Sequence, residues 1–128
     1  MTILVLDASL TVRSMIDELL CEMQFDNLNI ELFENGNEAL EFVQTNSVDL
    51  VFSAIETEGM DGITFVDLIL RDNPKLVSKL FIVTSQNNTE HFEDMKDVGA
   101  KRFIKKPINS EYFRHFVIPE INKVLNRN

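Results

Sequence analysis

The chain has 128 residues, a length that suits one domain and is too short for two. Its 21 acidic residues outnumber its 12 basic residues, which gives a formal net charge of -9 at pH 7. This charge repels a phosphate backbone, so nucleic acid is not expected as a direct partner. No apolar run approaches the roughly 18 residues of a membrane span, and the N-terminus lacks the basic start and cleavage site of a signal peptide. We therefore expect a cytoplasmic protein with no membrane partner.

Short apolar runs alternate with helical periodicity from one end of the chain to the other. Residues 3–6 are typical of a buried strand, and the apolar residues within 12–23 recur every three or four positions, which predicts an amphipathic helix. A second strand is predicted at 29–33, and the turn-forming residues 35–37 predict the start of a second helix. The continuous apolar run at 48–55 is typical of a central parallel strand that is covered on both faces.

The second half of the chain continues this alternation. The pattern predicts a helix over 63–70 that Asn73 and Pro74 stop, a strand at 80–84, a polar loop at 86–89, a helix that ends at Gly99, a strand at 102–105 and a last helix over 113–124. Proline inside a helix removes a backbone donor and clashes with a carbonyl one turn earlier, at a cost of roughly 3 kcal/mol. We therefore expect the last helix to kink or break between His115 and Pro119.

Three residue types on these helices could carry chemistry, but each has a simpler structural explanation. His91 and His115 lie away from the strand ends and are expected on the surface. Cys21 lies among apolar residues with no cation nearby in the sequence, which predicts a packed core thiol. Four methionines are better explained as core residues than as part of a cofactor site: Met15, Met23, Met60 and Met95.

Strands that alternate with helices predict an α/β fold with a doubly wound parallel sheet, right-handed crossovers and helices on both faces. In open sheets of this kind, ligands bind beyond the carboxyl ends of the strands, where the strand order reverses. The residues at these ends are therefore the candidates for a site. They are Asp7, Ala54, Glu56, Thr84 and Lys106.

These positions, with the sequence around them, resemble the receiver domain of bacterial two-component response regulators, including the single-domain chemotaxis type. Four stretches carry the resemblance, and they cover essentially the whole chain: 3–9, 49–62, 81–85 and 98–107. The resemblance implies a flavodoxin-like receiver fold, with a five-stranded sheet in the order 2-1-3-4-5. It also implies that residues 1–128 form one receiver domain.

The family's chemistry needs an aspartate at the end of the third strand, which attacks a phosphoryl group and becomes an acyl phosphate. Ala54 stands at that position, and a methyl group can neither attack phosphorus nor bind a metal. By resemblance, Thr84 carries the hydroxyl role and Lys106 the cationic role in what remains of the phosphate pocket. We therefore expect no enzymatic activity and no phosphorylation of the chain as it stands.

Magnesium normally screens the phosphate in this family, and acidic oxygens hold it. By resemblance, Asp7 takes the metal role, with Glu56 as a second, weak candidate. Ala8 replaces the other acid of the usual first-strand pair. No cofactor is therefore required, and magnesium should bind weakly if at all.

Most of these positions also have a plain structural interpretation. Asp7 could start a turn or cap the next helix, and Thr84 could be an ordinary strand residue. Lys106 could be a solvated lysine, and Glu56 could be only a loop charge. Phe103 matches the family's aromatic switch position, as Thr84 matches its hydroxyl switch, but it could equally be a core phenylalanine.

Lys106 also carries two geometric predictions. A partly buried ammonium without a partner is costly, so Lys106 should turn to Asp7 or to another oxygen of the pocket. The resemblance further implies a cis peptide bond between Lys106 and Pro107, although most such bonds are trans.

Two functions remain open from the sequence. The first is a stand-alone natural pseudo-receiver that acts by protein–protein interaction, and Ala8 favours it because one engineered change would not explain a second lost acid. The second is a conventional phosphorylatable regulator with an engineered aspartate-to-alanine change at residue 54. A small flavodoxin-like enzyme is disfavoured because residues 7–10 replace the Gly-rich phosphate loop such enzymes need.

By resemblance, partners are expected to bind the face made by the fourth helix, fifth strand and fifth helix. In this sequence the face corresponds to residues 88–98, 102–105 and 110 onward. A histidine kinase is one candidate partner.

Overall fold

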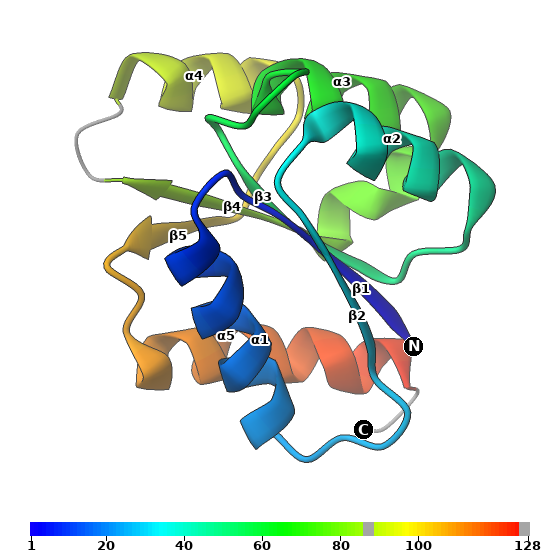
Figure 1. Cartoon of the computed structure of the whole chain (residues 1–128), viewed down its shortest axis with the longest axis vertical. Helices are drawn as coiled ribbons and strands as arrows, with labels where there is room; N and C mark the ends of the chain where they lie inside the picture. The colour runs from blue at the N-terminus through cyan, green and yellow to red at the C-terminus, as the bar shows by residue number, and fades with distance from the viewer. Residues whose placement is uncertain (86–88, 126–128) are drawn as a thin grey trace.

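Five parallel strands form one sheet in the order β2-β1-β3-β4-β5 in the computed structural model, which describes residues 1–85 and 89–125 (Figure 1). The strands are β1 (Thr2–Leu6), β2 (Asn29–Phe33), β3 (Leu50–Ala54), β4 (Leu80–Ser85) and β5 (Phe103–Lys106). Each neighbouring pair is parallel, so every connection crosses over one face of the sheet. The predicted doubly wound α/β fold and its strand order are confirmed.

Helices cover both faces of this sheet. They are α1 (Leu10–Glu22), α2 (Gly36–Thr45), α3 (Gly62–Asp72), α4 (Thr89–Asp97) and α5 (Ser110–Val124), with a 3-10 helix η1 (Pro74–Lys79) that the sequence did not predict. Helices α2, α3 and α4 lie on one face, and α1 and α5 lie on the other (Figure 1). Most of the predicted polar loop at 86–89 falls on residues 86–88, outside the described residues. Across the described part of the chain, no helix combines the length and apolar character needed to cross a membrane.

Side-chain alternation along the strands divides the interior into two cores. Leu4, Val51 and Ile82 face α2, α3 and α4, whereas their neighbours in sequence face α1 and α5. On the second face Phe52 stacks between Phe81, at 5.2 Å between ring centroids, and Phe113, at 5.5 Å. Every residue of β3 is buried, as the continuous apolar run predicted, because cores lie on both sides of this strand.

Short polar side chains fix where four of the helices begin. Each accepts a hydrogen bond from a backbone N–H in the first turn of its helix, which satisfies a donor that has no partner within the helix. These N-cap residues are Ser9 for α1, Asn35 for α2, Asp61 for α3 and Asn109 for α5. The predicted start of the second helix at Asn35 is confirmed. At Asp61, the hydrogen bond from the backbone of Thr64 lowers the pKa of the carboxyl, although burial opposes the shift.

The predicted core positions of Cys21 and Met15 are wrong, because both side chains are exposed. The face of α1 that meets the sheet carries Ile16, Leu19 and Leu20. Each residue turns an α-helix by about 100°, so the positions just outside this set rotate away from the core. The Cys21 thiol lies instead beside Asp17, with Sγ 3.8 Å from Oδ1. Met95, in contrast, is fully buried as expected.

The predicted break in the last helix is also wrong, since α5 runs without interruption from Ser110 to Val124 with Pro119 inside it. Val117 before the proline and Ile121 after it are both fully buried against the sheet. Burial of one such side chain is worth about 1.5–3 kcal/mol, so two of them offset the roughly 3 kcal/mol that an internal proline costs. Packing therefore holds both halves of the helix in place. The kink stays a prediction.

Candidate functional site

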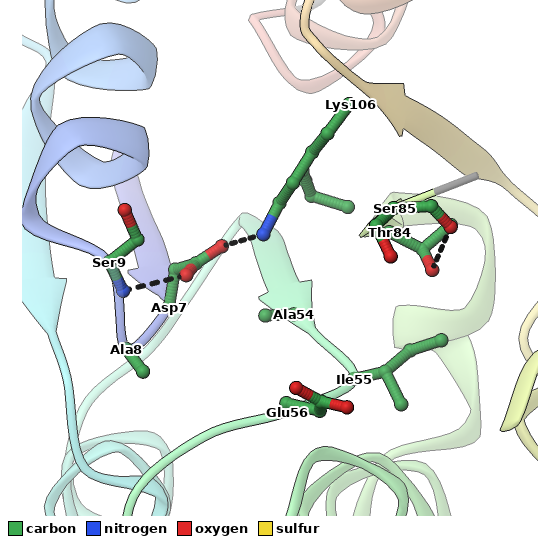
Figure 2. A pocket seen from close by; sticks show the side chains of 10 residues that line it. Asp7, Ala8, Ser9, Ala54, Ile55, Glu56, Thr84, Ser85 and Lys106 are labelled. Carbon is green, nitrogen blue, oxygen red and sulfur yellow. Dashed lines mark hydrogen bonds and ion pairs between the residues drawn. The ribbon is translucent and has the colours of Figure 1, made fainter. Parts of the chain in front are cut away.

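The carboxyl ends of β1, β3, β4 and β5 meet at one edge of the sheet, around a cavity of about 250 Å³ (Figure 2). Its lining residues are Asp7, Ala8, Ser9, Ala54, Ile55, Glu56, Val83, Thr84, Ser85 and Lys106. The structure therefore brings together all five strand-end residues that the sequence singled out. Their roles in signalling stay predictions, because position alone does not test them.

Strand register explains why these residues meet. Leu6 pairs with Ser53 across β1 and β3, and Ser85 pairs with Lys106 across β4 and β5, so the strands end at the same level. Side chains alternate between the faces of a sheet. Asp7, Ala54 and Lys106 consequently point to the face that α1 and α5 cover, and they approach one another over the end of β3 (Figure 2).

Lys106 is paired with Asp7, as predicted. Its Nζ lies 2.9 Å from Asp7 Oδ2, and the two side chains are only 27% and 4% exposed. Asp7 Oδ2 is buried, and within the described residues Lys106 supplies the cation that reaches it. The contact is therefore a charge pair that compensates an otherwise costly buried carboxylate. The Lys106–Pro107 peptide bond is cis, which confirms the second prediction about this residue.

The other oxygen of Asp7 organises the start of α1. Oδ1 accepts a hydrogen bond of 2.9 Å from the backbone N–H of Ser9. Ser9 is itself the N-cap, and its hydroxyl accepts from the backbone N–H of Val12 at 3.3 Å. Asp7 thus lines the pocket and also fixes the turn that leads into the helix, while its metal role stays a prediction.

Arg13 is a contributor that the sequence analysis missed. Its Nη1 donates a hydrogen bond of 2.7 Å to the backbone carbonyl of Asp7 and lies 4.0 Å from Glu34 Oε2. The side chain is only 13% exposed, so this cation is held close to the strand end. No signal in the sequence pointed to this contact, because the acceptor is a backbone carbonyl.

Thr84 and Ser85 line the opposite side of the cavity, at the end of β4. Thr84 is 4% exposed, and its hydroxyl donates a hydrogen bond of 3.3 Å to the carbonyl of Ser85. Ser85, which the sequence analysis did not consider, is exposed at the mouth of the cavity. Glu56 is also exposed and lies on the rim (Figure 2).

Phe103 does not line the cavity. Its ring packs against Phe92 of α4, with 4.2 Å between the centroids, and it is only partly buried. Lys96 of the same helix lies over the Phe92 ring at 4.4 Å. The aromatic pair joins β5 to α4, so the structure agrees with a packing role, and the switch role stays a prediction.

The two histidines lie on the surface, as expected. His91 and His115 are exposed and belong to α4 and α5. His91 Nδ1 lies 3.9 Å from Asp94 Oδ2, a loose contact within one helix. Neither residue lines the cavity at the strand ends.

Comparison with known proteins places this geometry in a family. The sequence profile described as "Response regulator receiver domain" matches residues 3–117. The chain belongs to this family. The strand order, the cavity at the strand ends and the Lys106–Asp7 pair are thus features of a receiver domain of two-component signalling.

Known relatives of this receiver occur in proteins of different length. The chain is 31% identical over 124 residues to the chemotaxis protein CheY of Bacillus subtilis, with 97% of each chain covered. It is 32% identical over 114 residues to a cyclic di-GMP phosphodiesterase of Thermotoga maritima, of which it spans only 29%. Among solved structures, it matches the receiver domain of an HD domain-containing protein from Pseudomonas fluorescens Pf-5 with a TM-score of 0.82. That match covers 95% of this chain and 87% of the other at 20% identity, which supports the fold alone.

The family implies a magnesium ion beside the acceptor position, and the side chains of this receiver do not fit one. The carboxylate of Asp7 is engaged by Lys106 at 2.9 Å, while Ala8 and Ala54 offer methyl groups where oxygen ligands are needed. Within residues 1–85 and 89–125, no group of three or more His, Cys, Asp or Glu side chains is placed to hold a metal ion. The weak magnesium affinity expected from the sequence stays a prediction.

Proposed function

We propose that this receiver works as an interaction module of two-component signalling that is not phosphorylated, because Ala54 replaces the acceptor aspartate. The observation that supports the proposal is Ala54 itself. Its methyl group is 2% exposed and forms the floor of the cavity at the end of β3, between Asp7 and Thr84 (Figure 2). By family resemblance this is the acceptor position, and a methyl carbon has no lone pair with which to attack phosphorus.

The charges around Ala54 support the same proposal. Lys106, which in a phosphorylatable receiver would meet the acceptor and its phosphoryl group, is committed to Asp7 at 2.9 Å. The pair neutralises itself, so the pocket needs neither a metal nor a phosphate to balance its charges. A protein of this kind would present one conformation of its partner surface without a phosphorylation signal.

We further propose that partners bind the face that α4, β5 and α5 form. Phe103 and Tyr112 border a hollow on this face, and Tyr112 is 48% exposed, so its aromatic side chain is accessible to a partner. A histidine kinase is one candidate partner, and a cytoplasmic location, as expected from the sequence, fits this role.

Intact-mass measurement after incubation with acetyl phosphate and magnesium tests the proposal. The wild-type protein should gain no phosphoryl group. A stable phosphoryl adduct on the wild-type protein would overturn the proposal and direct attention to His91, His115 or another aspartate.

Restoring the acid separates the proposal from its alternative, a conventional regulator whose aspartate was replaced by engineering. Ala54→Asp restores the nucleophile, and Ala54→Asn is the matched control because it has the same shape but cannot form an acyl phosphate. Continued inertness of Ala54→Asp would favour a natural pseudo-receiver, since the remaining pocket would then be unable to support the reaction. Phosphorylation of Ala54→Asp but not of Ala54→Asn would favour the alternative, which the retained Thr84 and Lys106 make chemically reasonable.

A further inference from the structure

A groove lies between the start of α3 and one side of α4, two helices that pack side by side on the same face of the sheet (Figure 1). Its volume is about 540 Å³, which is enough for a small molecule or a large side chain. Among the described residues, those that line this α3–α4 groove are Ile55, Glu56, Thr57, Asp61, Ile63, Thr64, His91 and Asp94. Of this set, Ile55 and Glu56 also line the strand-end cavity, and the other six belong to the groove alone.

The two sides of α4 have different surroundings. His91 and Asp94 are three positions apart, so they share the side of the helix that borders the groove. Phe92 and Lys96 are four positions apart and share another side, where the Phe92 ring packs on Phe103 of β5. The groove therefore opens away from β5, and it is not part of the α4-β5-α5 face.

The floor of the groove is apolar. Ile55 is 4% exposed at the end of β3, and Ile63, in the first turn of α3, is partly buried against the core. The hydroxyls of Thr57 and Thr64 both have hydrogen-bond partners within the chain. Because these polar groups are already satisfied, the floor offers a ligand mainly apolar contact.

The rim of the groove is acidic. Glu56, Asp61 and Asp94 are exposed, and no lysine or arginine is found among the described lining residues. The two carboxylate oxygens of Asp61 are held in place, since they accept from the backbone N–H of Thr64 at 2.8 Å and from its hydroxyl at 3.0 Å. The hydrogen bond from the Thr64 backbone lowers the pKa of this carboxyl, so it is charged at neutral pH. Each oxygen keeps a further lone pair with which it can accept from a ligand.

A metal ion does not match this arrangement. In the part of the chain that the structure describes, no three His, Cys, Asp or Glu side chains are grouped closely enough to hold one. The negative charges are instead spread along the rim of an apolar groove. An arginine side chain matches both features, because its methylene stem can lie on apolar surface while its planar guanidinium meets carboxylates at the edge. A guanidinium is also more weakly hydrated than an ammonium, which favours arginine over lysine.

We propose that the α3–α4 groove docks an arginine side chain from a segment of a partner protein. The stem would lie on Ile55 and Ile63, and the guanidinium would turn to the acidic rim. The formal net charge of -9 attracts such a basic segment and speeds its encounter with the chain. This inference goes beyond the proposed function, because it concerns a second surface and does not depend on the chemistry of Ala54.

A capped peptide, Ala-Leu-Arg-Leu-Ala, tests the chemistry. Amide resonances of a ¹⁵N-labelled sample are followed at pH 7 and constant ionic strength while the peptide is added. Saturable shifts are expected at Ile63, Thr64 and Asp94, with a Kd on the order of 1 mM. The same peptide with citrulline in place of arginine has nearly the same shape without the charge, and it should bind about tenfold more weakly. No saturable shift up to ~10 mM arginine peptide, or equal binding of the citrulline peptide, would overturn the proposal.

The source of the guanidinium is tested with N-acetylarginine amide, which lacks the rest of the peptide. Weaker binding of this compound than of the arginine peptide supports a protein segment as the occupant. Binding as tight as that of the peptide would overturn this part of the proposal, because a small free guanidinium compound would then suffice.

Three variants locate the docked side chain. Asp94→Asn removes one acid of the rim and should weaken binding of the arginine peptide about fivefold. Asp61→Asn should have a similar effect, and it should leave the start of α3 intact because asparagine also caps helices. Asp97→Asn is the matched control, since it removes the same charge from an exposed position of α4 outside the lining, and it should leave the Kd within about twofold of the wild-type value. An equal loss of binding in Asp94→Asn and Asp97→Asn would show general attraction to an acidic chain and would overturn the assigned location.

The outcomes for the groove and for the proposed function are distinguishable. Failure of the arginine peptide to bind would remove this inference and leave the proposed function standing. Phosphorylation of the wild-type protein by acetyl phosphate would remove the proposed function and leave the groove unaffected.

Discussion

Replacement of Lys106 by methionine is the sharpest test of how the pocket is held together. Met retains most of the stem and removes the ammonium that lies 2.9 Å from Asp7 Oδ2. The Asp7 side chain is 4% exposed, so its carboxylate would be left buried without a counter-charge. Breaking one side of a fully buried ion pair costs about 3–5 kcal/mol.

The loss of stability expected for Lys106→Met is smaller than the cost of breaking a fully buried pair, because the Lys106 side chain is 27% exposed and water can reach the pocket. We expect Lys106→Met to lower the free energy of unfolding at pH 7 by about 2 kcal/mol. For a domain of this size, that loss corresponds to a fall in melting temperature of roughly 6–8 °C. Urea denaturation and thermal denaturation, followed by circular dichroism, measure both quantities.

Two matched variants make the result interpretable. Lys105→Met changes the same residue type at an exposed position of β5 and should alter stability by no more than about 0.5 kcal/mol. Asp7→Asn removes the buried charge while keeping the oxygen that accepts from Ser9, so the double variant with Lys106→Met should be more stable than Lys106→Met alone. Equal stability of Lys106→Met and Lys105→Met, or no recovery in the double variant, would refute the account of the pair.

Three further predictions concern other parts of the molecule. Burial works to raise the pKa of Glu120, but its contacts with Arg102 and Lys123 outweigh burial and hold the pKa below the ordinary 4.5. The wild type should therefore be more stable than Glu120→Gln above pH 4.5. In urea denaturation from pH 7 downward, the difference in stability between the two proteins should shrink as the pH falls through the lowered pKa. Cys21 is exposed, so a thiol reagent should label it fully in the native state, whereas protection until urea is added would contradict the structure. Slight desolvation of the sulfur and then the neighbouring Asp17 raise the pKa of this thiol, so labelling should accelerate only at alkaline pH. A methyl group added to Gly62 would collide with the carbonyl oxygen of Ala54. Gly62→Ala should therefore lower the free energy of unfolding, measured by urea denaturation, by about 1–3 kcal/mol. Unchanged stability would contradict the close approach of α3 to the end of β3.

The sequence by itself determined the fold and which of the strand-end residues line the site. Apolar runs and helical periods differ in spacing, so their alternation predicted the parallel sheet without any knowledge of contacts. Parallel strands end at one edge, which placed Asp7, Ala54 and Lys106 together from their positions in the chain alone. Residue identity also gave the prediction that residue 54 does not accept phosphate, since a methyl group has no lone pair in any surroundings; that prediction awaits the phosphorylation assay.

Side-chain partners were decided by the tertiary structure. The sequence offered Lys106 several oxygens, and only the register of β1 against β3 and β5 against β4 selected Asp7 Oδ2. Arg13 was missed because its contact is with a backbone carbonyl, and sequence patterns do not reveal which carbonyls lie within reach of a long side chain. Periodicity also shows that a helix has an apolar face without fixing its edges, which is why Cys21 was assigned to the core and is exposed.

The continuous α5 illustrates the same division. The local rule for proline predicted a kink or a break near Pro119, and the rule is correct for an isolated helix, where the lost hydrogen bond and the clash with the carbonyl have no compensation. The sheet supplies that compensation by burying Val117 and Ile121 on either side of the proline. The local sequence determines which backbone conformations are costly. Whether burial offsets such a cost depends on residues that are distant in the chain, so only the packed structure shows it.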